Sequence, residues 1–172
     1  MFFNRFKNYL LKRKLKKCLS RVSQIASMNK VQTIGILVDE STFFQTLALK
    51  QSLIDNNFLE KDISIIAFRN PNIAIGACDY PVFGWKQISW SFQVQEDLIQ
   101  DFVQKPFDTL ISYYESDNSL LQWLTLESKA KFKVGFFAID KRLNHVLINT
   151  QVQNCKIFVQ EFVRVLKLFN KI

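Results

Sequence analysis

The chain has 172 residues, of which 48% are hydrophobic and 22% charged. These fractions are typical of one globular domain and exclude a disordered chain, a collagen-like fibre and a small disulfide-rich scaffold. The net charge of +8 arises in residues 1–30, which hold nine Lys/Arg and no Asp/Glu, whereas residues 31–172 hold fourteen Lys/Arg and fifteen Asp/Glu.

The basic segment predicts a helix over residues 2–27, because it lacks Gly and Pro and its apolar residues recur at helical spacing. One stripe consists of Phe2, Phe3, Phe6, Tyr9 and Leu10. A second consists of Leu11, Leu15, Cys18, Leu19, Val22 and Ile25. At about 100° per residue the two stripes face different directions. We therefore expect the helix to contact two surfaces or to break near residue 10. No run of ~7–15 apolar residues predicts a secretory signal here.

Strands and helices alternate over the rest of the chain. Apolar runs predict strands over residues 31–38, 62–68, 74–77, 107–113, 131–137 and 145–148. Amphipathic segments predict helices over residues 42–56, 95–104, 119–127 and 151–170. Asp39-Glu40-Ser41 and Asp117-Asn118-Ser119 are expected to supply the N-caps of two of these helices. Residues 69–92 are otherwise expected to be irregular.

This alternation predicts an α/β fold, namely a three-layer Rossmann-like domain with a mostly parallel sheet of five or six strands. A basic amphipathic N-terminal helix precedes the sheet. We expect residues 1–30 to form the helix and residues 31–172 to form the α/β domain.

Polar residues follow several of the predicted strands. In an open parallel sheet, ligands bind at the carboxyl ends of the strands. The candidate ligand rim comprises Asp39, Glu40, Ser41, Arg69, Glu115 and Asp117. These residues would serve a general base or a metal-assisted site, but strand ends also collect such residues as caps and solvated loops.

Specific chemistry has little support in the sequence. The loop after the first strand, Asp39–Thr42, has no glycine and two anions, so a phosphate would be repelled there. His145 is the only histidine, and its position at the start of a strand favours a structural role. The three cysteines form no CxxC pair. We predict no cofactor, no metal and no catalytic residue.

The cations of the N-terminal segment are the strongest deviation from an average domain. The residues expected to bind an anionic surface are Arg5, Lys7, Lys12, Arg13, Lys14, Lys16, Lys17 and Arg21. They would contact RNA or a ribonucleoprotein, or an anionic membrane into which Phe2, Phe3 and Phe6 dip. Alternatively, the stripe from Leu11 to Ile25 packs on its own domain or on a protein partner while the lysines face water.

Four segments resemble an uncharacterised family of small flavobacterial Rossmann-like proteins, a domain of unknown function. They are Thr33–Glu40, Lys86–Trp90, Phe107–Ser112 and Ser128–Gly135. The resemblance implies this fold and a cytoplasmic bacterial setting in the Bacteroidota, with no established activity.

A weaker similarity connects three segments with the N-terminal lobe of heptosyltransferase-like glycosyltransferases. The segments are Asp108–Ser112, Ser119–Leu121 and Lys133–Phe136. Such enzymes bind their nucleotide-sugar donor mainly in a second lobe, for which this chain is too short. The similarity therefore implies a half-fold without the donor site.

The sequence thus favours a non-catalytic interaction or adaptor protein. Its basic helix would engage RNA, a ribonucleoprotein, the inner membrane face or a protein partner, and the protein would be cytoplasmic or peripheral to the inner membrane. A homo-oligomer is also compatible with the sequence. The alternative is an enzyme or small-ligand-binding protein that uses the carboxyl-end rim of the sheet.

Overall fold

A computed structural model describes residues 2–19, 30–70, 78–89 and 96–172, with residues 2–5 as backbone only. Six parallel strands form one sheet in the order β3-β2-β1-β4-β5-β6. The strands are β1 (Ile34–Asp39), β2 (Ile63–Phe68), β3 (Val82–Phe83), β4 (Thr109–Tyr113), β5 (Phe132–Phe136) and β6 (Val146–Ile148). This is the strand order of a doubly wound Rossmann sheet, so the predicted fold class is confirmed.

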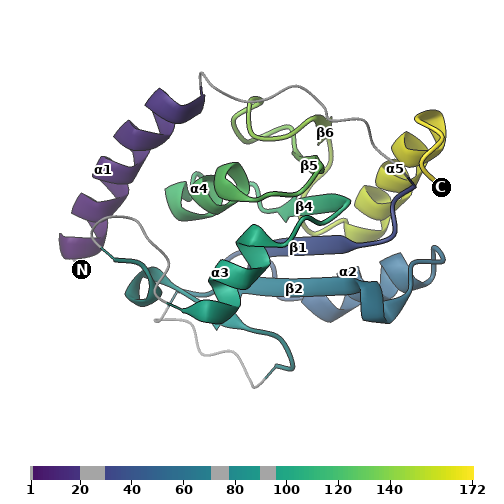
Figure 1. The fold of residues 1–172 in the computed structure, drawn as a ribbon, viewed down its shortest axis with the longest axis horizontal. Coiled ribbons are helices and arrows are strands. Elements are labelled where there is room, and N and C mark those ends of the chain that lie inside the picture. The colour runs from purple at the N-terminus through teal and green to yellow at the C-terminus, as the bar shows by residue number, and fades with distance from the viewer. Residues whose placement is uncertain (1, 20–29, 71–77, 90–95) are drawn as a thin grey trace.

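Helices cover both faces of the sheet (Figure 1). They are α1 (Phe2–Cys18), α2 (Thr46–Ile54), α3 (Asp97–Gln104), α4 (Ser119–Glu127) and α5 (Cys155–Leu168), with short 3₁₀ turns η2 (Glu60–Asp62) and η3 (Trp85–Gln87). One core cluster joins the sheet to α2 and α5. The other joins it to α3, α4 and α1. Crossovers on the two sides of the sheet place the helices in these two layers.

The central strand β1 is buried along its whole length. Ile34, Ile36 and Val38 belong to the cluster under α2 and α5, whereas Leu37 belongs to the cluster under α3 and α4. A strand that is covered on both faces has no solvent-facing positions. This is why the sequence there is almost continuously apolar instead of alternating.

Helix α1 adds a further layer over α4. Leu11, Leu15 and Leu19 are 0%, 4% and 3% exposed and share a core cluster with the leucines of α4. Every residue from Ser119 to Thr125 is buried as a result. The second apolar stripe of the N-terminal helix therefore packs on its own domain, and α1 is unbroken at residue 10. The predicted helical residues 20–27, with Val22 and Ile25, lie outside the described residues.

One predicted helix cap is wrong. Helix α2 begins at Thr46 after Gln45, which makes no side-chain cap bond. The carboxylate of Asp39 instead accepts from the Ser41 amide, and the Asp39 carbonyl accepts from the amide of Thr42. The segment after β1 is therefore a tight turn, because the Asp39 side chain bonds to its own backbone two residues on.

The second predicted cap is confirmed, because the Asn118 side chain accepts from the Leu120 amide at the start of α4. The strand expected over residues 74–77 lies outside the described residues. In the described part of this region the short strand is β3, which pairs only with Ala67 and Phe68 of β2.

Candidate functional site

The carboxyl ends of the strands lie at the end of the sheet that α1 borders, on the left in Figure 1. The strand order reverses between β1 and β4, and ligands of doubly wound proteins bind at such a switch point. The predicted rim residues come from the last position of β1 and from the loops that follow β1, β2 and β4. The structure divides them into two groups with different surroundings.

Glu40 and Arg69 form a buried ion pair at the ends of β1 and β2. Glu40 is 2% exposed and accepts from Arg69 Nε and from Thr46 Oγ1, both at 2.6 Å. The Tyr80 hydroxyl also donates to Glu40. Burial and this hydrogen bond raise the pKa of Tyr80 to about 12. These partners occupy the carboxylate, so Glu40 has a structural role as a tie between strands and helix.

Asp39 and Ser41 are also bonded within the fold. Asp39 Oδ2 accepts from the Ser116 hydroxyl at 2.6 Å, and Ser41 Oγ accepts from the Asn70 amide at 3.0 Å. Asp39 is buried, which leaves it no contact with solvent at the rim. Four of the predicted rim residues precede β4 in the chain, namely Asp39, Glu40, Ser41 and Arg69. Their hydrogen bonds therefore connect the loops at this end of the sheet.

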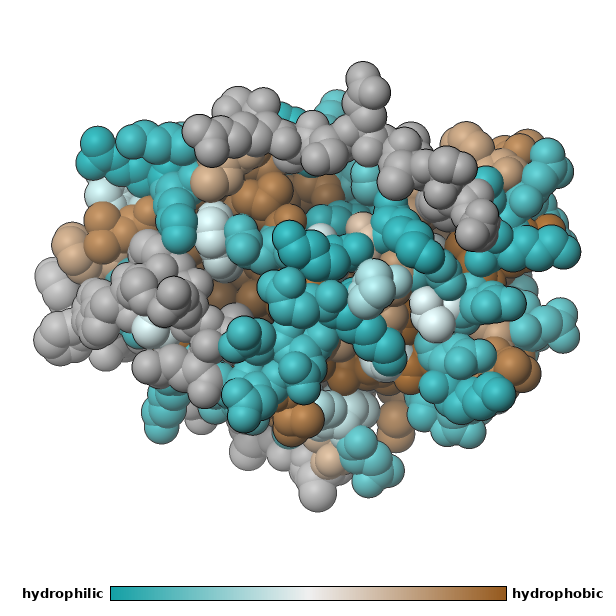
Figure 2. Space-filling model, viewed as in Figure 1, coloured by the Kyte–Doolittle hydropathy of each residue, from teal (hydrophilic) through white to brown (hydrophobic). Residues whose placement is uncertain are grey.

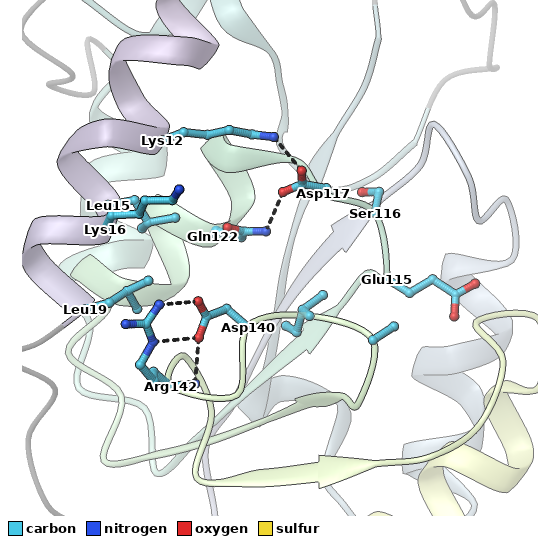
Figure 3. Close-up of a pocket in the computed structure, with 12 residues that line it drawn as sticks. Lys12, Leu15, Lys16, Leu19, Glu115, Ser116, Asp117, Gln122, Asp140 and Arg142 are labelled. Carbon is cyan, nitrogen blue, oxygen red and sulfur yellow. Dashed lines mark hydrogen bonds and ion pairs between the residues drawn. The ribbon is translucent and has the colours of Figure 1, made fainter.

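A pocket of about 360 Å³ lies between α1 and the loops that follow β4 and β5 (Figure 3). It combines residues from both sets of sequence candidates. The basic helix contributes Lys12 and Lys16, and the rim contributes Glu115 and Asp117. The lining is completed by Leu15, Leu19, Ser116, Gln122, Ala138, Ile139, Asp140 and Arg142.

Most charges in this pocket are paired with one another. Lys12 bonds to Asp117, which also accepts from Gln122. Arg142 donates to both carboxylate oxygens of Asp140, at 3.0 and 2.7 Å. Figure 3 shows Glu115 directed away from both pairs. The pocket therefore suits a small polar molecule better than a phosphate, which needs an excess of cations or backbone N–H groups.

Sequence reasoning did not identify Gln122 and Arg142 as pocket residues. Gln122 is on the outer side of α4 and is buried only because α1 covers that helix. Arg142 lies two residues after Asp140, and this short spacing is the one local signal that the two form a pair.

Catalytic and metal chemistry gain no support from the described residues. His145 Nδ1 accepts from the Lys133 amide at 2.8 Å, and its ring stacks on Phe132. Burial and the nearby Lys133 lower the pKa of His145. Within the described ranges, no group of three or more His, Cys, Asp or Glu side chains is arranged to hold a metal.

The predicted cations of α1 fall into two groups. Lys7 donates to the carbonyl of Ile88, Lys12 pairs with Asp117, and Lys14 lies 4.4 Å from the ring centroid of Trp123. These three are engaged by the domain. Lys14 is nonetheless exposed, as are Arg13, Lys16 and Lys17. The Arg5 side chain and Arg21 lie outside the described part of the chain.

Three of the exposed cations, Arg13, Lys16 and Lys17, share one side of α1 with two exposed aromatics. We call Phe6, Tyr9, Arg13, Lys16 and Lys17 the outer face of α1. Their spacing of 3, 7, 10 and 11 residues from Phe6 places them on one side of a helix, opposite the buried leucines. Phe6 is 52% and Tyr9 64% exposed. In Figure 2, hydrophobic colour lies at the N-terminal part of α1 and hydrophilic colour along its C-terminal part.

No helix among the described residues has both the length and the apolar character that a membrane span requires.

Comparisons with curated proteins and with solved structures found no significant match, and the glycosyltransferase similarity is not shown by them. A family of unknown function, DUF6913, matches residues 7–169, which include the described part of α1 from Lys7 as well as the whole sheet. The chain belongs to the DUF6913 family.

Proposed function

We propose that this protein is a non-catalytic, cytoplasmic adaptor that docks on the anionic inner face of a membrane through the outer face of α1. The observation that carries the proposal is the combination of two half-exposed aromatic side chains with three exposed cations on one helix side. Aromatic rings insert at the headgroup boundary while Lys and Arg attract anionic lipids.

The fold supports this use of α1 because it leaves the outer face exposed. The leucine stripe anchors the helix to α4, so the helix is held in place before it meets a surface. A prefolded helix loses less conformational entropy on binding than a disordered basic tail does. No acidic residue occurs in residues 1–30 to weaken the attraction.

The pocket is a weaker basis for function because its ion pairs neutralise most of its charge. The outer face presents the exposed cations Arg13, Lys16 and Lys17. Each cation near an anionic membrane surface contributes about 1 kcal/mol of binding free energy. Loss of all three attractions should weaken binding by roughly a hundredfold.

The test is vesicle flotation of the full chain with neutral phosphatidylcholine and with phosphatidylcholine containing phosphatidylglycerol. The proposal predicts flotation with the anionic vesicles that declines as salt rises, and none with neutral vesicles. The variant Arg13→Glu/Lys16→Glu/Lys17→Glu should lose at least the hundredfold attributed to the three cations.

A matched control separates the outer face from general charge. The variant Lys61→Glu/Lys156→Glu/Lys167→Glu reverses three other exposed cations and reaches the same net charge. It should float as the natural chain does. Equal loss in both variants would overturn the proposal, because the attraction would then depend on net charge alone.

The aromatics have their own pair of variants. Phe6→Ala/Tyr9→Ala should weaken flotation even at high salt, because insertion of apolar surface is not screened. Phe44→Ala/Phe137→Ala removes two other exposed rings and should have no effect. Circular dichroism checks that each variant is folded.

Binding to RNA is the competing outcome. Fluorescence anisotropy with single-stranded poly(U) measures it for the same variants. If the natural chain binds poly(U) through Arg13, Lys16 and Lys17 and leaves anionic vesicles unbound, the membrane proposal fails and a nucleic-acid surface replaces it.

A further inference from the structure

Among the described residues, β3 covers only part of the sheet edge at β2. The neighbouring strand β3 has two residues and pairs only with Ala67 and Phe68. On the side away from β1, the first four residues of β2, Ile63–Ile66, pair with no strand among the described residues. An unpaired edge of this kind is a template for another strand.

Backbone groups of Ile65 point toward this open edge. The amides of Ala67 and Arg69 donate to carbonyls of the segment that contains β3. The carbonyl of Phe68 points the other way and accepts from the Glu40 amide, which follows β1. Because groups alternate along a strand, Ile65 presents both its N–H and its C=O on the same side as Ala67. The Ile63 amide is already bonded to Glu60, so Ile65 is the central residue of the open stretch.

A groove of about 380 Å³ runs along these residues. Helix α2 borders it on one face of the sheet with Leu47, and helix α3 borders it on the other with Leu98. These leucines are 61% and 59% exposed. The groove thus offers a backbone edge between two helices, each of which presents an exposed leucine beside charged residues.

We infer that a second copy of this chain occupies the groove, with the two β2 strands antiparallel about a two-fold axis at Ile65. Ile65 of each copy would then exchange both of its outward hydrogen bonds with Ile65 of the other. The two sheets would join into one. This inference is independent of the proposed membrane function.

The charges on α3 favour a second copy over an unrelated peptide. Asp101 and Lys105 both line the groove and lie one helical turn apart. Lys105 Nζ is 3.3 Å from Ser64 Oγ, which places it beside the proposed axis. A two-fold axis perpendicular to the sheet brings the two α3 helices together antiparallel, so Asp101 of each copy faces Lys105 of the other. Such reciprocal complementarity is a property of a self-association surface.

The test exchanges the charges at Asp101 and Lys105. Size-exclusion chromatography with light scattering measures the oligomeric state of each variant. The natural chain should be a dimer. Asp101→Lys and Lys105→Asp, each alone, should weaken the dimer at least about tenfold, because like charges then face each other. An equal mixture of the two single variants should form a mixed dimer, and Asp101→Lys/Lys105→Asp should restore the dimer.

Asp97→Lys is the matched control, since it makes the same charge change on α3 outside the groove. It should leave the dimer intact. Amide exchange at Ile65 should be slow in the natural chain and at least about tenfold faster in either single variant. A monomeric natural chain would overturn the inference, as would single variants that remain dimeric or a mixture that fails to associate.

Discussion

The hydroxyl of Ser116 donates a 2.6 Å hydrogen bond to Asp39 Oδ2 and joins the loops that follow β4 and β1. The strand order reverses between these two strands, so the helices that follow them lie on opposite faces of the sheet. Because the chain leaves these two strands in opposite directions, a crevice forms between their loops in doubly wound folds. The Ser116–Asp39 bond therefore bridges the position where other doubly wound proteins admit a ligand.

Replacing Ser116 with Ala should destabilise the protein by about 2 kcal/mol, because a buried carboxylate loses one of its hydrogen-bond donors. Urea unfolding followed by circular dichroism measures the change. A loss below roughly 0.5 kcal/mol, the range of neutral surface substitutions, would mean that water replaces the hydroxyl without cost.

Leu15→Ala should destabilise the whole domain by about 2–5 kcal/mol, since Leu15 is 4% exposed in the core under α1. The control is Arg13→Ala, two residues earlier on the exposed side, with an expected change within roughly 0.5 kcal/mol. Each variant should unfold in one cooperative transition. If Leu15→Ala alters only a small early transition, α1 unfolds separately from the sheet.

For the same reason, a chain that begins at Lys30 is a poor probe of surface binding. It would lack Leu11, Leu15 and Leu19 and would expose the outer side of α4. The substitutions on the outer face of α1 avoid this problem because those side chains lie away from the core.

Lys133 should make stability rise with pH on the alkaline side. Its ammonium group donates to the carbonyls of Thr125 and Leu126, and burial and the charge of Lys129 lower its pKa from 10.5 to about 8. Between these values the unfolded chain holds a proton that the folded chain has lost, so unfolding becomes less favourable as pH increases.

We expect the free energy of unfolding to gain roughly 1–3 kcal/mol between pH 8 and pH 10 relative to the variant Lys133→Met, which has no such charge. Urea titrations of both proteins across this range measure the difference. Parallel pH profiles for the two proteins would show that Lys133 titrates near its ordinary pKa in the folded state.

Gly135 and Asn144 should be energetically coupled. A Cβ at Gly135 would lie 2.5 Å from Asn144 Nδ2, and Asn144 is held by a bond from the Ser112 hydroxyl. Gly135→Ala should therefore cost about 1–3 kcal/mol through overpacking. In the background Asn144→Ala, the same change should cost at least about 1 kcal/mol less. Equal costs in both backgrounds would contradict the clash.

The sequence predicted most of the strands and helices because burial patterns are local. The all-buried strand β1 and the amphipathic helix α5 each show their surroundings in their own residues. The cap of α2 was mispredicted because an Asp side chain can bond either to a following helix or to its own turn, and the choice depends on the approach of Ser116.

The outer face of α1 could be predicted from the sequence, whereas the pocket could not. The pocket requires α1 to return over α4, a contact between segments about a hundred residues apart, and no local pattern shows it. The outer face follows from helical spacing once the leucine stripe is known to be buried. The sequence left open whether that stripe packs on its own domain or on a partner, and the contacts of Leu11, Leu15 and Leu19 resolve this question.

The layer that α1 forms over α4 also constrains the order of events during synthesis. α1 leaves the ribosome long before α4 has been translated, and ribosomes add about 5–20 residues per second. For several seconds or longer the leucine stripe and the cations of α1 are therefore exposed together on a nascent chain. During that interval both the leucine stripe and the outer face of the helix are accessible to a membrane or a chaperone. Once α4 covers the stripe, only the outer face remains accessible.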